Sequence, residues 1–410
     1  MASWKSLEDF VRSIASLRYG APCQSEHVGG VNIDGVVHLG ADEQVLIEIT
    51  ENMTLEKVRA DITKIAAARM SLLTQGVSCR AFLIMDGEPT PSMVEQGTAS
   101  HVSVLSVKKY ENDFFDYHSY ARLRKVQPFG SAVDSETGEN DSRQYVGVTF
   151  DEKPSGRKVN VAGICEALTR GGNVVVTGDY GTGKSRLVRE VFQELEKRSR
   201  SAGGYAIAIN LRDHWGSGNF LEILGGHLQR IGLSGSVDNA IRLLRSRNLI
   251  LLLDGFDEIG AQSHDHQLVD RTTLRKHALR GVRDLVQASG GGILITGRSH
   301  YFDDDQEMLD ALGLGSSAQV KILGVPPNFT KDQAKAYLQA IGLEIDPPDW
   351  LPMKPLVFQI AAELEKEDLK KLLSAVTGAF EFWGMFLGAV TRRESKGVQG
   401  SISPMAIQRI

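Results

Sequence analysis

The octapeptide GDYGTGKS at residues 178–185 constrains the fold more than any other part of this sequence. It follows the apolar run NVVVT and precedes RLVREVFQEL, in which the apolar residues have helical spacing. A glycine-rich turn between a strand and a helix points successive backbone N–H groups at one place, and the helix N-terminus adds its dipole. The spacing GxxxxGK[ST] therefore predicts a loop that binds the phosphates of a nucleotide, in preference to a simple turn.

Residues of this loop have distinct expected roles. Lys184 would reach the β- and γ-phosphates, and the hydroxyl of Ser185 would bind Mg²⁺. The remaining contacts with the nucleotide would come from the rest of the loop and the start of the helix, which are Gly178, Asp179, Tyr180, Gly181, Thr182, Gly183 and Arg186. A nucleotide and Mg²⁺ are thus the expected cofactors.

Two later apolar runs end in polar residues that belong near such a loop. LILLLDGFDE (249–258) places Asp254 at the end of a buried strand, where it can bind Mg²⁺, and Asp257 or Glu258 can orient or deprotonate the attacking water. GILITGRSHYF (292–302) ends in Arg298, whose guanidinium can contact the γ-phosphate. The alternatives are a polar surface loop after the first strand and an exposed arginine after the second.

The pattern of apolar runs divides the chain into four segments. We expect a first α/β domain over residues 1–127, and a polar, turn-rich linker over 128–158. Residues 159–324 alternate strands and helices, which is typical of a parallel sheet with helices on both faces. The strands expected there are NVVVTG, YAIAINL, LILLLD, GILITG and AQVKIL. Residues 325–410 are mostly helical and would form a subdomain beside the nucleotide domain.

GDYGTGKS, LLLDGFDE, ITGRSHYF and the proline of MKPL (353–356) together resemble the NACHT branch of the STAND signalling NTPases. The resemblance extends over about residues 160–400. It implies that the nucleotide is ATP or ADP, that Pro355 packs against the adenine, and that the helical segment closes over the nucleotide. It also implies that the chain forms a homo-oligomer on activation.

Members of this family usually continue into a winged-helix domain and a sensor. We expect the chain to stop at SPMAIQRI, at about the start of the winged helix, so that the sensor lies outside this sequence. These residues therefore do not identify the molecule that activates the protein, and a phage protein is one candidate.

Two carboxylates in the first domain suggest a second site. IDG (33–35) and IEIT (47–50) place Asp34 and Glu48 on two strands of one hairpin, where they can share a Mg²⁺ ion suited to cutting a phosphodiester. The expected order of helix, hairpin, helix and strand resembles the PD-(D/E)xK restriction-endonuclease fold. By this resemblance Glu26 would be a further acid, and DNA the substrate.

The second site departs from that family at one position. The lysine expected two residues after the acid is Thr50 in this chain. Lys57, in the following helix, could supply the ammonium from a shifted position, and Lys64 is a less favoured choice. The alternative is a nuclease-like fold kept only for binding or assembly.

Composition sets the remaining limits. A formal net charge of -5 gives no overall sign of nucleic-acid binding, and three scattered cysteines suit a reducing cytoplasm. The apolar stretch at 378–390 is too short to span a bilayer, so we expect no membrane association. HDH at 264–266 is expected to be an exposed loop and not a metal site.

These expectations combine into one function with two rivals. The chain would be an ATP-dependent switch that oligomerises and drives DNA cleavage by its N-terminal domain, in bacterial antiphage defence. One rival is a nucleotide-gated scaffold whose N-terminal domain recruits a partner, which the missing lysine favours. The other is a transcriptional regulator of the STAND group, against which the lack of an evident DNA-reading helix counts.

Overall fold

The computed structural model describes residues 3–134, 137–198, 204–246, 248–260, 270–315, 320–374 and 378–397. The HDH tripeptide and the last thirteen residues, including the expected start of a winged helix, lie outside these ranges. The chain divides into two compact units. The first comprises Met1–Tyr120 with Gly235–Leu243, and the second comprises Ala121–Ser234 with Leu244–Ile410.

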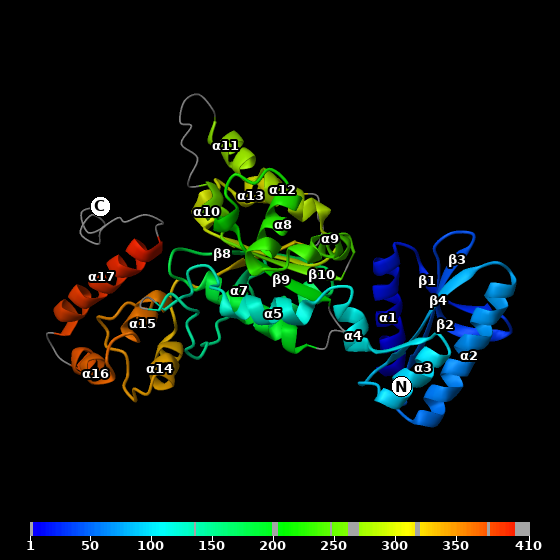
Figure 1. Ribbon diagram of the computed structural model, residues 1–410. Coiled ribbons are helices and arrows are strands. Elements are labelled where there is room, and N and C mark those ends of the chain that lie inside the picture. The colour runs from blue at the N-terminus through cyan, green and yellow to red at the C-terminus, as the bar shows by residue number, and fades with distance from the viewer. Residues whose placement is uncertain are drawn as a thin grey trace. The chain divides into compact units, whose positions relative to one another are not determined.

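The first unit contains a five-stranded sheet in the order β1-β2-β3-β4-β5. The strands β1, β2 and β3 are antiparallel, whereas β3, β4 and β5 are parallel. Figure 1 shows α1 on one face of this sheet and α2 and α3 on the other. The elements are α1 (Ser3–Tyr19), β1 (Cys23–Val28), β2 (Val31–His38), β3 (Glu43–Thr50), α2 (Leu55–Thr74), β4 (Ser78–Met85), α3 (Pro91–Ala99), β5 (Ser103–Ser106), α4 (Val107–Asn112) and the start of α5 (Tyr117–Val126).

The expected hairpin is confirmed as β2 and β3, and it is followed by the expected helix α2 and strands β4 and β5. The sequence reading missed β1, which forms the edge of the sheet. Its residues CQSEHV are exposed except at the two ends. An edge strand with exposed side chains needs no alternation of apolar and polar residues, so it leaves no periodic signal.

The second unit contains a seven-stranded sheet in the order β7-β6-β12-β8-β11-β10-β9. The five strands from β12 to β9 are parallel, which confirms the expected parallel sheet. Figure 1 shows α7 below this sheet and α8 and α12 above it, so both faces are covered. The strands are β6 (Phe150–Lys153), β7 (Arg157–Val159), β8 (Asn173–Thr177), β9 (Tyr205–Asn210), β10 (Leu249–Asp254), β11 (Ile293–Gly297) and β12 (Val320–Gly324).

The helices around this sheet follow the strands in the usual alternation. They are α6 (Val161–Thr169), α7 (Lys184–Lys197), α8 (Phe220–Ile231), α10 (Phe256–Gly260), α11 (Arg271–Ala278), α12 (Arg280–Ala288) and α13 (Asp305–Ala311). The helix α9 (Val237–Arg245) follows α8 in the chain and belongs to the first unit as far as Leu243. Each residue of β10 is buried, and so is each residue of β11. Complete burial of a strand on both faces is the reason that these segments read as continuous apolar runs.

Residues 128–158, which we expected to be a linker, contain ordered structure. The strands β6 and β7 form a hairpin in this segment, and β6 pairs with β12 in an antiparallel arrangement. The turn of this hairpin lies in DEKPSGRK (151–158), one part of the polar, turn-rich segment that suggested a linker. The segment thus extends the sheet of the nucleotide domain.

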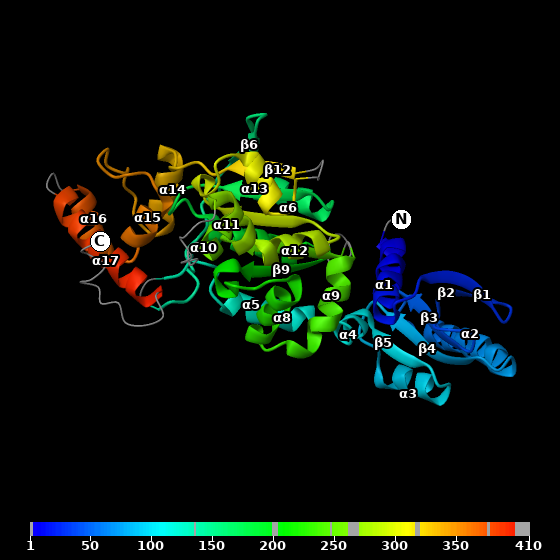
Figure 2. The same ribbon diagram turned by 90° about the horizontal axis from the view of Figure 1, so that it is seen from above.

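Four helices follow the last strand: α14 (Lys331–Ala340), α15 (Pro355–Ala361), α16 (Lys366–Ser374) and α17 (Gly378–Gly397). Figure 2 shows them as a group of their own at the orange and red end of the chain. Their core contains Phe329, Leu338, Phe358, Leu369 and Phe382, which confirms the helical subdomain. Within the residues that the structure describes, no helix is long and apolar enough to cross a membrane.

Candidate nucleotide site

The predicted phosphate-binding loop lies between β8 and α7. Gly181 has a φ of 75° and Gly183 a φ of 90°, and the helix begins at Lys184. These positive φ values are strained for residues with a side chain, which explains the two glycines. A Cβ on Gly181 would also lie 2.8 Å from the Cβ of Leu356, so the loop passes close to α15. The backbone therefore has the tight course that a phosphate cradle needs.

Lys184 extends back across this loop. Its Nζ donates hydrogen bonds to the carbonyl oxygens of Gly178 and Asp179, at 2.8 and 2.9 Å. Burial lowers the pKa of Lys184 below its ordinary value, while the charges of Asp257 and Asp254 act in the opposite direction. An ammonium has three donors, so one beyond these two hydrogen bonds can serve a phosphate oxygen.

Asp254 and Ser185 face a common point. The carboxylate of Asp254 is 6% exposed, and its Oδ1 accepts a 2.5 Å hydrogen bond from the hydroxyl of Thr296. A Cβ on Gly130 would lie 2.1 Å from Oδ2 of Asp254 and 2.5 Å from Oγ of Ser185. Two hard oxygen ligands close to one point are the donor set that Mg²⁺ prefers, so the residues fit the metal that the loop implies.

The two acids after Asp254 have different surroundings in the structure. Arg298 donates from Nε to one oxygen of Asp257 at 2.9 Å and from its backbone N–H to the other at 3.1 Å. The carboxylate of Asp257 is thereby engaged by the residue expected to contact the γ-phosphate. Burial raises the pKa of Glu258 to about 7, and the charge of Asp254 adds to this shift. A carboxyl with a pKa near neutrality is suited to accept a proton from water.

The loop opens into a cavity of about 320 Å³. Pro355 lines it, as expected, and the backbone N–H of the next residue, Leu356, donates to the carbonyl of Gly181 at 3.1 Å. Apolar and aromatic side chains form part of the remaining wall, namely Tyr145, Val146, Val148, Phe150, Phe329, Tyr337 and Leu356, and Gln144, Arg212 and Gln359 line it as well. The apolar part of a cavity next to a phosphate cradle is suited to a purine base.

The sequence reading missed one wall of this cavity. Residues 128–148, which we call the strap, join α5 to β6, and the structure describes 128–134 and 137–148 of them. Ser131, Ala132, Asp141 and the segment 144–148 line the cavity, although all of them fall in the expected linker. The available signal was the alternation of apolar residues in YVGVTF (145–150), which the preceding polar stretch obscured.

Asp34 and Glu48 lie together in the first unit, as expected. Glu48 is 3% exposed, and burial raises its pKa to about 8, with Lys64 opposing this shift and Asp34 adding to it. The Oδ2 of Asp34 accepts a 3.0 Å hydrogen bond from the backbone N–H of Ile49. The Oε2 of Glu48 is buried without a hydrogen-bond partner.

Two lysines lie near these acids in the structure. The Nζ of Lys64 contacts Glu48, whereas the Nζ of Lys57, the lysine we expected to act here, lies 2.6 Å from Asp61, four residues further along α2. The carboxylate of Glu26, the expected further acid, pairs with His38 at 2.7 Å. Among the described residues, no group of three or more histidine, cysteine and acidic residues could hold a metal ion.

A phosphate loop after the first parallel strand, a buried aspartate ending β10 and an arginine after β11 define the second unit as a P-loop NTPase. Residues 173–341 match the NACHT domain model. This segment is therefore a NACHT P-loop NTPase domain.

Solved structures give a weaker comparison. A DNA replication initiation factor is 17% identical, with a TM-score of 0.27 over 58% of this chain and 61% of that one. The ADP form of the Aeropyrum pernix ORC2 protein is 13% identical, with a TM-score of 0.31 over 61% of this chain and 65% of that one. This chain thus spans less than two thirds of the length of both. Domain III of the Thermotoga maritima replication initiation protein DnaA is 12% identical, with a TM-score of 0.28 over 60% of this chain and 87% of that one. Scores of this size do not establish a shared fold, and no curated protein matches the sequence.

Proposed function

We propose that this chain is an ATP-dependent signalling switch. The observation that carries the proposal is the hydrogen bond from Leu356 of α15 to Gly181 of the phosphate loop, beside the cavity that both segments line. A nucleotide in this cavity would touch the sheet domain and the helical subdomain together. The nucleotide state would then determine how the sheet domain and the helical subdomain are arranged. That arrangement would be the two-state element that a switch requires.

The residues of the site have separate tasks in the proposed hydrolysis. Lys184 binds the β- and γ-phosphates, and Glu258 orients the attacking water and accepts its proton. Arg298, held by Asp257, contacts the γ-phosphate and responds to its loss. When bound to Ser185 and Asp254, Mg²⁺ supplies charge neutralisation at the phosphate oxygens.

The proposal is tested by comparing the protein with ATP and Mg²⁺, with ADP, and without nucleotide. We expect a larger assembly with ATP than with ADP, because the switch is proposed to oligomerise in its ATP state. Light scattering coupled to gel filtration measures the mass, and small-angle scattering measures the change in shape. Identical mass and shape in all three states would contradict a nucleotide-driven switch.

Asp254→Asn is expected to remove the effect of Mg²⁺ on ATP binding. Asparagine preserves the acceptor for Thr296 but removes the charge that holds the metal. We expect the Mg²⁺-dependent gain in ATP affinity to fall by about tenfold or more, with binding in EDTA unchanged. Calorimetry with and without Mg²⁺ measures this difference. Asp349→Asn is the control, because that side chain is 93% exposed and does not line the cavity.

For the first unit we propose a nuclease-like effector that acts on DNA. Asp34 and Glu48 lie on neighbouring antiparallel strands, and the unpartnered Oε2 of Glu48 offers an oxygen that a Mg²⁺ ion could take. Lys64 replaces the lysine missing at Thr50 and would stabilise charge on the phosphate. By the family resemblance, assembly of the switch would activate these units in antiphage defence. A scaffold without catalysis is favoured by Thr50 and remains the competing proposal.

Two variants, Lys64→Met and Lys57→Met, test the proposed nuclease against the proposed scaffold. We expect Lys64→Met to reduce DNA cleavage by about a hundredfold, because it removes the ammonium next to Glu48. Lys57→Met should preserve cleavage, since Lys57 pairs with Asp61. Cleavage of plasmid is measured in ATP-bound oligomers with Mg²⁺ or Mn²⁺, together with the melting shift that Mn²⁺ produces. Absence of both cleavage and a Mn²⁺ shift in the parent protein would favour the scaffold.

A further inference from the structure

The strap passes through the place where the proposed Mg²⁺ ligands meet. Gly130 has a φ of 50°, and a Cβ built on it would lie within 2.1 Å of Oδ2 of Asp254 and 2.5 Å of Oγ of Ser185. The backbone N–H of Ser131 points at the same hydroxyl from 3.5 Å. Mg²⁺ binds oxygen at about 2.0–2.1 Å and requires six ligands around it. A metal bound to both oxygens on this side would therefore lie against the backbone of the strap at Gly130.

The strap is held there by Asn210, at the end of β9. Its Oδ1 accepts a 3.0 Å hydrogen bond from the N–H of Gly130, and its Nδ2 donates to the carbonyl of Pro128 at 3.0 Å. Arg124 of α5 donates to Oδ1 of Asn210 at 3.0 Å and to the Pro128 carbonyl at 3.2 Å. The Arg124 side chain is 1% exposed and also donates to the carbonyl of Ala208 at 2.7 Å. Buried polar groups with this many partners fix one conformation of the backbone.

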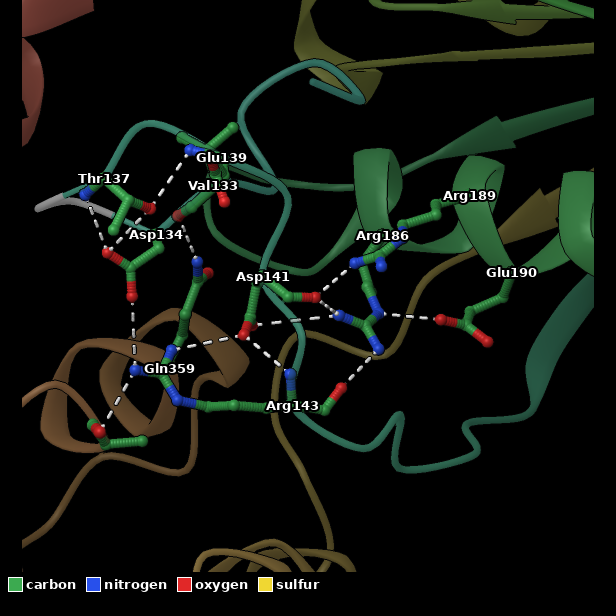
Figure 3. Close-up of polar contacts among 11 residues, drawn as sticks. Val133, Asp134, Thr137, Glu139, Asp141, Arg143, Arg186, Arg189, Glu190 and Gln359 are labelled. Carbon is green, nitrogen blue, oxygen red and sulfur yellow. Dashed lines mark hydrogen bonds and ion pairs between the residues drawn. The ribbon is translucent and has the colours of Figure 1, made fainter. Parts of the chain in front are cut away.

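A second set of contacts ties the strap to α7, the helix that carries Ser185. Arg186 donates to the carbonyls of Asp141 and Arg143 at 2.7 and 2.6 Å, and Arg189 also donates to the Asp141 carbonyl. Arg186 in turn pairs with Glu190 at 2.8 Å. Figure 3 shows both arginines converging on Asp141. Movement of the strap would thus disturb the first two turns of α7.

A third set of contacts reaches the helical subdomain. Gln359 of α15 donates to the carbonyl of Val133 at 2.9 Å, and Arg143 donates to the carbonyl of Ala362 at 3.1 Å. Figure 3 shows Gln359 reaching Val133. The strap is therefore hydrogen-bonded to β9, to α7 and to the end of α15, and it continues directly from α5.

We propose that the strap is a gate on the metal site, so that residues 129–132 and a Mg²⁺ ion compete for the space between Ser185 and Asp254. Binding of Mg·ATP withdraws the strap from Asn210, and its contacts with α7 and α15 carry the change to the helical subdomain. The same withdrawal pulls on α5, through which the chain runs toward its N-terminal unit. This inference rests on the proposed nucleotide and Mg²⁺ site.

Hydrogen exchange of the strap tests the gate in the unaltered protein. The N–H of Gly130 is bonded to Asn210, and that of Ala132 to the carbonyl of Phe129 at 2.9 Å, so both should exchange slowly with ATP in EDTA. We expect Mg²⁺ with ATP to speed their exchange by about tenfold or more. Equal or slower exchange with Mg·ATP would overturn the proposal, because the strap would then be a fixed wall of the loaded site.

Asn210→Ala gives an independent test. Removing the amide releases the N–H of Gly130 and removes one of the two donors to the Pro128 carbonyl, so the gate opens more easily and the ATP-bound protein should take up Mg²⁺ at about a tenfold lower concentration. A Mg²⁺ titration of a fluorescent ATP analogue bound to the protein measures this. Asn219→Ala is the matched control, since it removes the cap of α8 and no contact of the strap. A weaker response to Mg²⁺ in Asn210→Ala than in the control would overturn the gate.

These outcomes can be told apart from failure of the proposed function. If the fluorescent nucleotide does not bind in EDTA, or binds equally well to Lys184→Ala, the nucleotide site itself is wrong. If the nucleotide and Mg²⁺ both bind while strap exchange and the Asn210→Ala titration show no change, only the gate is wrong.

Discussion

Lys184→Ala is expected to abolish ATP binding. The Nζ of Lys184 bridges the two carbonyls at the start of the phosphate loop, so it lies against the loop that is proposed to hold the phosphates. Each hydrogen bond from an ammonium to a charged oxygen contributes about 1.5–3 kcal/mol. Losing its bonds to two phosphates should weaken binding by at least about a hundredfold, and alanine has no donor to replace them.

Calorimetry with ATP and with ADP measures this loss. Lys331→Ala is the matched control, because that side chain is 79% exposed and its ion pair lies on the surface of the helical subdomain. Melting temperatures of both variants show whether they fold. A folded Lys184→Ala protein that binds ATP with the affinity of the control would remove the basis for the nucleotide site.

The strands of the nucleotide domain could be predicted because they are buried on both faces. Every residue of β10 is buried, so its sequence LILLLD reads as one apolar run that stops at the aspartate. The end of such a run also marks the edge of the sheet, which is why the sequence located Asp254 and Arg298 as well. Burial of the strands therefore made the fold of this domain, and much of its candidate site, predictable from the sequence.

The strap could not be predicted for the opposite reason. Its described residues, 129–134 and 137–143, form few regular backbone pairs, and polar side chains such as Asn140 and Asp141 hold them in place. Such contacts depend on partners far along the chain, for example Asn210 and Gln359. Such contacts produce no periodic pattern in the sequence, so the sequence predicted a linker for this segment.

The lysine of the first unit shows where spacing alone fails. Lys57 and Lys64 are seven residues apart and so lie on the same face of α2. Spacing alone therefore could not choose between them. Asp61 distinguishes the two lysines, because it is buried one turn after Lys57 and pairs with the Lys57 ammonium. Glu48 pairs with Lys64. The sequence could have suggested this pairing at four-residue spacing.

Glu258→Gln is expected to stop hydrolysis without weakening ATP binding. Glutamine has the same shape but cannot accept a proton from water, and the reaction should slow by about 10²- to 10⁴-fold. Burial holds the pKa of the parent carboxyl at about 7, so the parent enzyme has this acceptor at neutral pH in a substantial fraction of molecules. Binding should persist because Glu258 is proposed to act on the attacking water and not to hold the phosphates.

Asp257→Asn gives the comparison that assigns the role. Its carboxylate accepts both the side chain and the backbone N–H of Arg298, so the amide would weaken the placement of that arginine but leave Glu258 intact. We expect Asp257→Asn to keep measurable turnover at a rate well above that of Glu258→Gln. Phosphate release and ATP affinity are measured for both variants at the same pH. If Glu258→Gln hydrolyses ATP at the parental rate while Asp257→Asn does not, the proton acceptor is Asp257, and the ion pair with Arg298 must open during the reaction.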